Sequence, residues 1–154
     1  MKYLRIIALL IMSALFSLAN IYCCGKCRSG DESHKRDALT VQIDKPFTLQ
    51  FGQISYMESE NLYVELIEIT EDSRCPVGVV CAWEGQATAL IGFNKGENTK
   101  ADYSVTSRAG HPDLAKTEFD NYSITLMELL PAKVAGETIQ PTDYKIELII
   151  SKAD

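Results

Sequence analysis

The sequence has only two histidines, His34 and His111, and neither has a visible nucleophile or a set of metal ligands around it. Nucleophilic catalysis by a Ser-His-Asp or Cys-His arrangement needs a positioned base, and nothing in the sequence identifies one. There is also no glycine-rich loop of the kind that holds phosphates. We therefore predict no catalytic residue, no metal site and no cofactor.

Basic residues are outnumbered: 15 Lys and Arg stand against 21 Asp and Glu, which gives a formal net charge of −6. An acidic surface repels the phosphates of nucleic acids and the headgroups of anionic lipids. Nucleic acid is therefore not expected as a partner, and the charge is expected to keep the protein in solution.

Long apolar runs are limited to one, residues 6–18, which follows a basic start that contains Lys2 and Arg5. A membrane-spanning helix needs about 20 apolar residues, so this run is short for that role. A basic start followed by an apolar run of this length is typical of a secretory signal. We therefore expect an exported protein.

Two processing sites are compatible with this signal. Ser17 and Ala19 offer small residues to a general signal peptidase, which would cut before Asn20. Cys23 and Cys24 instead follow the apolar run as in a degenerate lipobox, where a cysteine is acylated and becomes the new N-terminus. Cys24 fits better, because a small residue precedes it, and we favour lipidation there.

The expected organisation follows from this choice. Residues 1–23 form a lipoprotein-type signal peptide, residues 24–37 a flexible polar tether, and residues 38–154 a single all-β domain. The expected location is the cell envelope, with the protein held at the membrane by its lipid anchor. A soluble secreted or periplasmic protein is the alternative.

From residue 39 onward, short runs of alternating apolar and polar residues are separated by turn residues, a pattern typical of β-strands. Strands are expected at residues 39–43, 47–51, 62–69, 86–93, 101–106, 122–130 and 144–151. Their number and spacing favour an antiparallel β-sandwich or a partly open barrel of about seven to nine strands.

Two of these strands change the phase of their alternation, after Leu66 and after Leu126. A β-bulge, or a strand that leaves one sheet for the other, would produce such a change.

Residues 61–69 also resemble residues 121–129. We prefer two core strands of like composition to an internal duplication. The strand at 144–151 keeps its phase and is expected to bury its even-numbered residues.

Cysteines occur at positions 23, 24, 27, 75 and 81. In an exported protein we expect Cys75 and Cys81 to form a disulfide, which closes a small ring and contributes about 2 kcal/mol to stability. Cys27 is then left without an assigned partner. A metal site of Cys24, Cys27 and His34 is a minor alternative, because zinc sites normally take a second ligand pair from a folded scaffold.

Residues 71–85, E-D-S-R-C-P-V-G-V-V-C-A-W-E-G, contain this cysteine pair and the chain's single tryptophan. Trp83 lies two residues past Cys81, so both side chains point the same way in an extended chain. We expect the indole to pack against the disulfide in the core. The alternative is an indole that stacks on a ligand such as a sugar ring.

The pattern D-S-R-C-P, a short gap and then C-x-W-x-G resembles a recurrent family of small bacterial secreted proteins and lipoproteins. The likeness covers roughly residues 45–151 and includes D-Y-K-I-E-L near the C-terminus. The resemblance implies an envelope location and an all-β fold. It implies no particular activity and no functional residues.

The candidate binding residues are Asp72, Arg74, Trp83 and Glu84, all in the loop between two predicted strands. Strands supply a scaffold, whereas rigid loops present groups to partners. Arg74 is the first candidate, because a guanidinium can bind a partner carboxylate through two hydrogen bonds. The alternative is that Arg74 pairs with Asp72 or Glu84 of its own chain.

The expected function is that of a non-enzymatic binding module for an envelope or secreted protein or ligand. One version is an inhibitor of secreted hydrolases, since a disulfide loop can pre-organise a segment that mimics a substrate. The alternative is an enzyme or accessory subunit that acts on envelope polymers through carboxylates such as Asp72 and Glu84.

Lipidation at Cys24 is directly testable. Cells that grow with a radiolabelled fatty acid should incorporate the label into the protein, and Cys24→Ser should abolish the label and release the protein from membranes. Cys23→Ser is the matched control and should retain both. A mature N-terminus at Asn20, with all of the protein soluble, would contradict the prediction.

Overall fold

The computed structural model describes residues 38–96 and 99–153. The predicted signal peptide, the predicted lipidation site Cys24 and the predicted tether at 24–37 lie outside the described residues, as do Cys27 and His34. None of the helical turns in the described part is long and apolar enough to cross a membrane.

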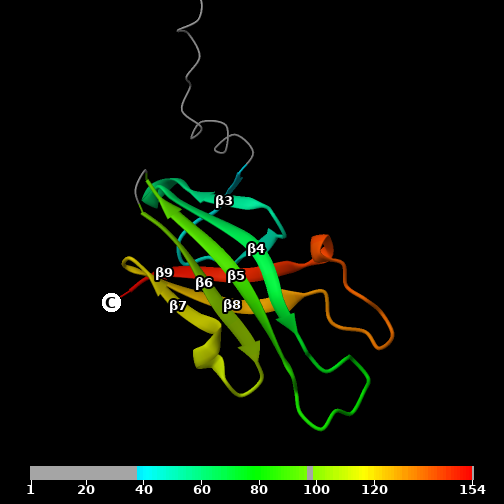
Figure 1. Ribbon diagram of the computed structural model, residues 1–154. Helices are drawn as coiled ribbons and strands as arrows, with labels where there is room; N and C mark the ends of the chain where they lie inside the picture. The colour runs from blue at the N-terminus through cyan, green and yellow to red at the C-terminus, as the bar shows by residue number, and fades with distance from the viewer. Residues whose placement is uncertain (1–37, 97–98, 154) are drawn as a thin grey trace, which may run out of the picture. The chain divides into compact units, whose positions relative to one another are not determined.

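The described residues form nine strands in two sheets (Figure 1). The first sheet has the order β1-β3-β4-β5-β6, and the second has the order β2-β9-β8-β7. All pairs are antiparallel except β1 with β3. The strands are β1 (Leu39–Thr40), β2 (Phe47–Gln50), β3 (Ile54–Met57), β4 (Leu62–Asp72), β5 (Gln86–Lys95), β6 (Thr99–Arg108), β7 (Lys116–Phe119), β8 (Tyr122–Leu130) and β9 (Lys145–Lys152). Three 3₁₀ turns join them: η1 (Glu58–Glu60), η2 (Pro112–Ala115) and η3 (Pro141–Asp143).

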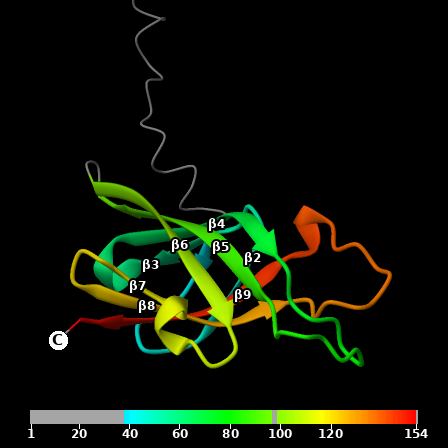
Figure 2. The ribbon, with the colours of Figure 1, turned by 60° about the horizontal axis from the view of Figure 1, so that its bottom comes forward.

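The two sheets lie as two layers and enclose one core, which confirms the predicted β-sandwich (Figure 2). Ile146, Leu148 and Ile150 of β9 are fully buried, as the alternation of that strand predicted. Val64 and Leu66 of β4 are buried in the same core from the other sheet. Each fully buried aliphatic side chain of this size contributes about 1.5–3 kcal/mol, so these inward rows hold the layers together.

Both predicted changes of phase are β-bulges. The register of β4 against β5 shifts at Ile67, and the register of β8 against β9 shifts at Met127. One extra residue at each point restores the following apolar residues to the core, so that Ile69 still packs against it. The register of β4 shifts a second time at Thr70.

The sequence analysis did not predict β3 and β7. In β3, Ser55, Tyr56 and Met57 are all buried, so the strand has no polar face and shows no alternation. In β7, only Phe119 of the four residues is buried, so its apolar signal is too weak to detect. Strands of four residues give the two-residue period little room to appear.

At the end of the sandwich where β5 turns into β6, polar side chains join the two sheets. The Tyr122 hydroxyl donates to Glu60 Oε2 at 2.6 Å, and Lys152 Nζ lies 3.4 Å from Glu60 Oε1. Lys95 Nζ of β5 lies 2.6 Å from Asp120 Oδ2 and 4.7 Å from the centroid of the Tyr122 ring. The hydrogen bond from Tyr122 is the largest cause that lowers the pKa of Glu60 below its ordinary value.

This network predicts how stability depends on pH. A carboxyl group whose pKa is lowered by folding stabilises the fold above its unfolded pKa, about 4.3 for Glu, and that stability is lost as the pH falls through the folded pKa. In Tyr122→Phe the pKa of Glu60 returns toward its ordinary value, so the loss of stability between neutral and acid pH should shrink. Urea denaturation at both pH values measures it.

Tyr103→Phe is the matched control, because Tyr103 makes ring contacts with Phe93 and Phe119 and no hydrogen bond through its hydroxyl among the described residues. It should keep the pH dependence of the wild type. An unchanged pH dependence in Tyr122→Phe would contradict the assigned role of this hydrogen bond.

Candidate binding site: the disulfide loop

Residues 73–85 form the loop that joins β4 to β5, and they project from one end of the sandwich (Figure 1). Cys75 and Cys81 form the predicted disulfide, with an S–S distance of 2.02 Å and a Cα–Cα distance of 6.0 Å. Below the disulfide, the Ser73 N–H donates to the Gln86 carbonyl at 2.8 Å, and the Cys75 N–H donates to the Glu84 carbonyl at 3.1 Å. Strand-like pairing therefore continues into the loop as far as the bridge.

Arg74 points back toward the sandwich. Its Nε and Nη2 donate to the two oxygens of Asp72 at 2.9 and 2.8 Å, with side chains only 18% and 9% exposed. Its Nη1 donates to the Leu129 carbonyl at 2.6 Å, and its Nη2 also donates to the Pro131 carbonyl at 2.9 Å. All three nitrogens thus bind groups of this chain, which favours the pairing alternative over a contact with a partner.

The Asp72 carboxylate also accepts a hydrogen bond from the Tyr144 hydroxyl at 3.0 Å. The backbone carbonyl of Asp72 accepts a hydrogen bond from Lys133 Nζ at 2.8 Å. Partial burial alone would raise the pKa of Asp72. The hydrogen bonds and positive charge of Arg74, with help from Tyr144, outweigh burial and hold this pKa below its ordinary value. Asp72 is therefore an ionised structural anion at neutral pH.

A second loop supports the first. The Val77 N–H donates to the Lys133 carbonyl at 2.9 Å, and Val77 forms an isolated parallel bridge with Val134 in the connection between β8 and β9. The two loops lie side by side in both ribbon views (Figures 1 and 2). The disulfide loop is therefore fixed at its base by Arg74 and along one side by this connection.

Gly85 explains the last position of the cysteine motif. Its φ is +71°, and a Cβ at this position would overlap the backbone carbonyl of Ser73 and lie 2.8 Å from the Cα of Arg74. Only glycine allows the two ends of the loop to approach so closely. The motif residues at both ends of the loop therefore build its base.

Trp83 is 50% exposed, so the prediction of a core tryptophan is wrong. Residues 77–84 are all exposed, because the loop has already left the space between the sheets when it reaches this position. The Arg108 guanidinium lies 5.9 Å from the centroid of the indole, and Arg108 Nε donates to Glu84 Oε1 at 3.0 Å. The pKa of Glu84 lies below its ordinary value. The largest cause is a hydrogen bond from its own backbone N–H, and the next is the hydrogen bond from Arg108.

Three valines that the sequence analysis did not select complete this surface. Val80 is fully exposed, and Val77 and Val79 are exposed beside it. We call these three residues together with Trp83 the loop tip. The sequence contained a signal for them, since the five residues between the bridged cysteines cannot fold back far enough to bury their apolar side chains.

The role of Arg74 can be measured by stability. Arg74→Ala leaves the Asp72 carboxylate and two carbonyls without their donor, and should lower the free energy of unfolding by about 2–3 kcal/mol. Arg74→Lys should recover little of it, because an ammonium cannot reproduce the two parallel hydrogen bonds. Urea denaturation measures both, with Lys116→Ala as an exposed cationic control. An unchanged stability, together with weaker partner binding, would restore the contact role.

The geometry defines a rigid loop whose tip presents apolar side chains. Comparison of this chain with protein-family models, with curated proteins and with solved structures gives no significant match. The resemblance to small bacterial secreted proteins therefore stays a prediction, and function has to be inferred from the site itself.

Proposed function

We propose that this protein is an exported envelope module that binds a partner through the loop tip and is not an enzyme. The observation that carries the proposal is the exposure of Val77, Val79, Val80 and Trp83 on one braced loop of an acidic domain. Exposed apolar side chains that are gathered in one place mark interaction surfaces more often than scattered ones do. Tryptophan is also among the residues that contribute most to binding energy at interfaces.

The supports of the loop favour binding for an energetic reason. A flexible loop loses conformational entropy when a partner immobilises it, at about 0.5–1.5 kcal/mol for each ordered side chain. Here the disulfide, the Arg74–Asp72 pair and the Val77–Val134 bridge order the loop before any partner arrives. More of the contact energy therefore remains as affinity.

An inhibitor of secreted hydrolases is the specific version that we favour. Val80 is the most exposed of the apolar side chains and lies next to Cys81, where the bridge holds the backbone. A small apolar side chain on a fixed, projecting loop suits insertion into the substrate pocket of an enzyme. The partner is then an exported enzyme with an apolar specificity pocket.

The enzymatic alternative has less support. Glycoside hydrolysis requires two carboxyl groups that flank the bond, one of them an acid with a raised pKa. The pKa values of Asp72 and Glu84 are both lowered, and each carboxylate is paired with its own arginine. Such groups act as charge partners within the fold.

The envelope location is part of the same proposal. Disulfides persist in oxidising compartments outside the cytosol, so the Cys75–Cys81 bridge agrees with export. A lipid on Cys24 and a polar tether over residues 24–37 would hold the domain near the membrane while its loop tip stays accessible.

The loop tip can be tested by quantitative capture of partners from envelope extracts. Val80→Asp and Trp83→Ala should each weaken capture of the same partner at least tenfold, as expected when an apolar anchor of an interface is removed. Met127→Asp is the matched control, because Met127 is an exposed apolar residue of β8 in the other sheet, 57% exposed. It should bind as the wild type does.

Wild-type capture by Val80→Asp and Trp83→Ala would contradict the proposal, as would an equal loss in Met127→Asp. Hydrolysis of an envelope polymer that disappears in Asp72→Asn or Glu84→Gln would favour the enzyme instead.

A further inference from the structure

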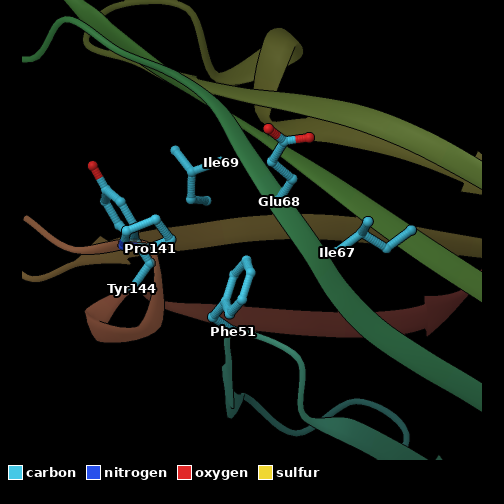
Figure 3. A pocket seen from close by; sticks show the side chains of 6 residues that line it. All are labelled: Phe51, Ile67, Glu68, Ile69, Pro141 and Tyr144. Atoms are coloured by element: carbon cyan, nitrogen blue, oxygen red, sulfur yellow. The ribbon is translucent and has the colours of Figure 1, made fainter.

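A second surface lies beside β4, outside the loop tip. A hollow of about 330 Å³ is lined by Phe51, Ile67, Glu68, Ile69, Pro141 and Tyr144. Figure 3 shows the Phe51 ring beside Pro141 and Tyr144, next to the strand that carries the other three residues. Five of the six side chains are apolar or aromatic, so the hollow suits an apolar group.

The strand next to this hollow has an unpaired edge. β3 pairs with β4 only along Leu62–Glu65, and a bridge between Phe51 and Leu66 occupies the next position. The Gly52 N–H donates to the Leu66 carbonyl at 2.9 Å. From Ile67 to Glu71, the only strand that pairs with β4 in the part of the chain that the structure describes is β5. Backbone groups on the opposite edge are therefore open to another strand.

The charge of the hollow is negative. Glu68 is its single charged residue, it is exposed, and its carboxylate has no hydrogen bond or ion pair within residues 38–96 and 99–153. The chain as a whole carries a net charge of −6. A ligand with a positive charge next to its apolar group is therefore complementary to this surface.

We propose that the hollow and the free edge of β4 bind an extended peptide, with an apolar side chain in the hollow and a lysine or arginine beside Glu68. The free edge favours a peptide over a small amphipathic cation, because only a peptide can also pair with the strand. This proposal does not depend on the function of the loop tip.

The bulges of β4 limit the length of the contact. The register shifts at Ile67 and at Thr70 twist the strand, and such bulges prevent long edge-to-edge pairing. The peptide can therefore pair over only two or three residues and depends on its side chain in the hollow. We expect a weak interaction, with a Kd of about 0.1–1 mM.

The experiment is an NMR titration of the mature ¹⁵N-labelled protein with capped hexapeptides of Thr and Val that carry Phe-Lys or Leu-Lys in the middle. Amide shifts should appear along Ile67–Thr70 and at Phe51 and Tyr144. Replacement of the peptide's Lys by Glu should weaken binding by about threefold or more, a modest effect because the charge pair is exposed. Replacement of its Phe by Ala should weaken binding at least tenfold.

Two variants test the site on the protein. Glu68→Lys should reverse the preference, so that the Glu peptide binds better than the Lys peptide. Glu118→Lys is the matched control, because Glu118 is an exposed carboxylate of β7 in the other sheet, and should keep the wild-type preference. Ile67→Ala removes part of the wall and should weaken every peptide severalfold.

Backbone pairing is tested with two N-methylated peptides, one methylated at the odd and one at the even residues. Alternate residues of a strand direct their N–H groups to opposite edges, so only one of the two peptides should lose binding. The proposal is overturned if no peptide shifts these amides at about 1 mM, if Glu68→Lys keeps the wild-type preference, or if both methylated peptides bind as the parent does. Shifts that map to the loop tip would also overturn it. Val80→Asp should leave peptide binding unchanged, so failure here and failure of the loop tip are distinguishable.

Discussion

The Asp72–Arg74 pair is the interaction on which one end of this molecule depends. Asp72 ends β4 in the first sheet, whereas Leu129 lies in β8 of the second sheet and Tyr144 directly precedes β9 of that sheet. Because Arg74 and Asp72 bind both of these residues, one ion pair joins the two layers and the root of the loop. The disulfide orders the loop internally, and the Val77–Val134 bridge supports it along one side, whereas the Asp72–Arg74 pair ties its root to both sheets. A pair so little exposed is costly to break, since the remaining charge would lose its partner.

The loop contains two sets of residues with different roles. Asp72, Arg74, the two cysteines and Gly85 build the base through an ion pair, a disulfide and the close approach of the two ends of the loop. The side chains of the three valines and of Trp83 are exposed to solvent. The base thus consists of an ion pair, a disulfide and a glycine, whereas the presented surface consists of three valines and the chain's single tryptophan. Because Arg74 is paired within its own chain, we base the proposed binding surface on the loop tip.

The distance along the chain between contacting residues explains what the sequence could predict. The β-class and the disulfide depend on alternation or on spacing within a few residues, and both were predicted. The changes of phase at Ile67 and Met127 were also visible in the sequence, with a β-bulge as one of two expected explanations. The partners of Arg74 beyond Asp72 lie 55 and 57 positions along the chain, and Tyr144 lies 72 positions from Asp72. No local pattern reports contacts of that range. The hollow beside β4 is built from three separate segments and was not predictable for the same reason.

Tyr144 belongs to both surfaces, because its ring lines the hollow and its hydroxyl donates to Asp72 at the base of the loop. Two sites influence each other only through a difference in free energy between states of the protein. Asp72 keeps its two hydrogen bonds with Arg74 whether or not the Tyr144 hydroxyl is present, so a ligand in the hollow has little means to move the loop. The two proposed surfaces are therefore mechanically independent and rigidly spaced. For a partner that reaches both, a fixed spacing makes the second contact intramolecular, and a weak site in the hollow then adds to the affinity of the loop tip without any change of shape.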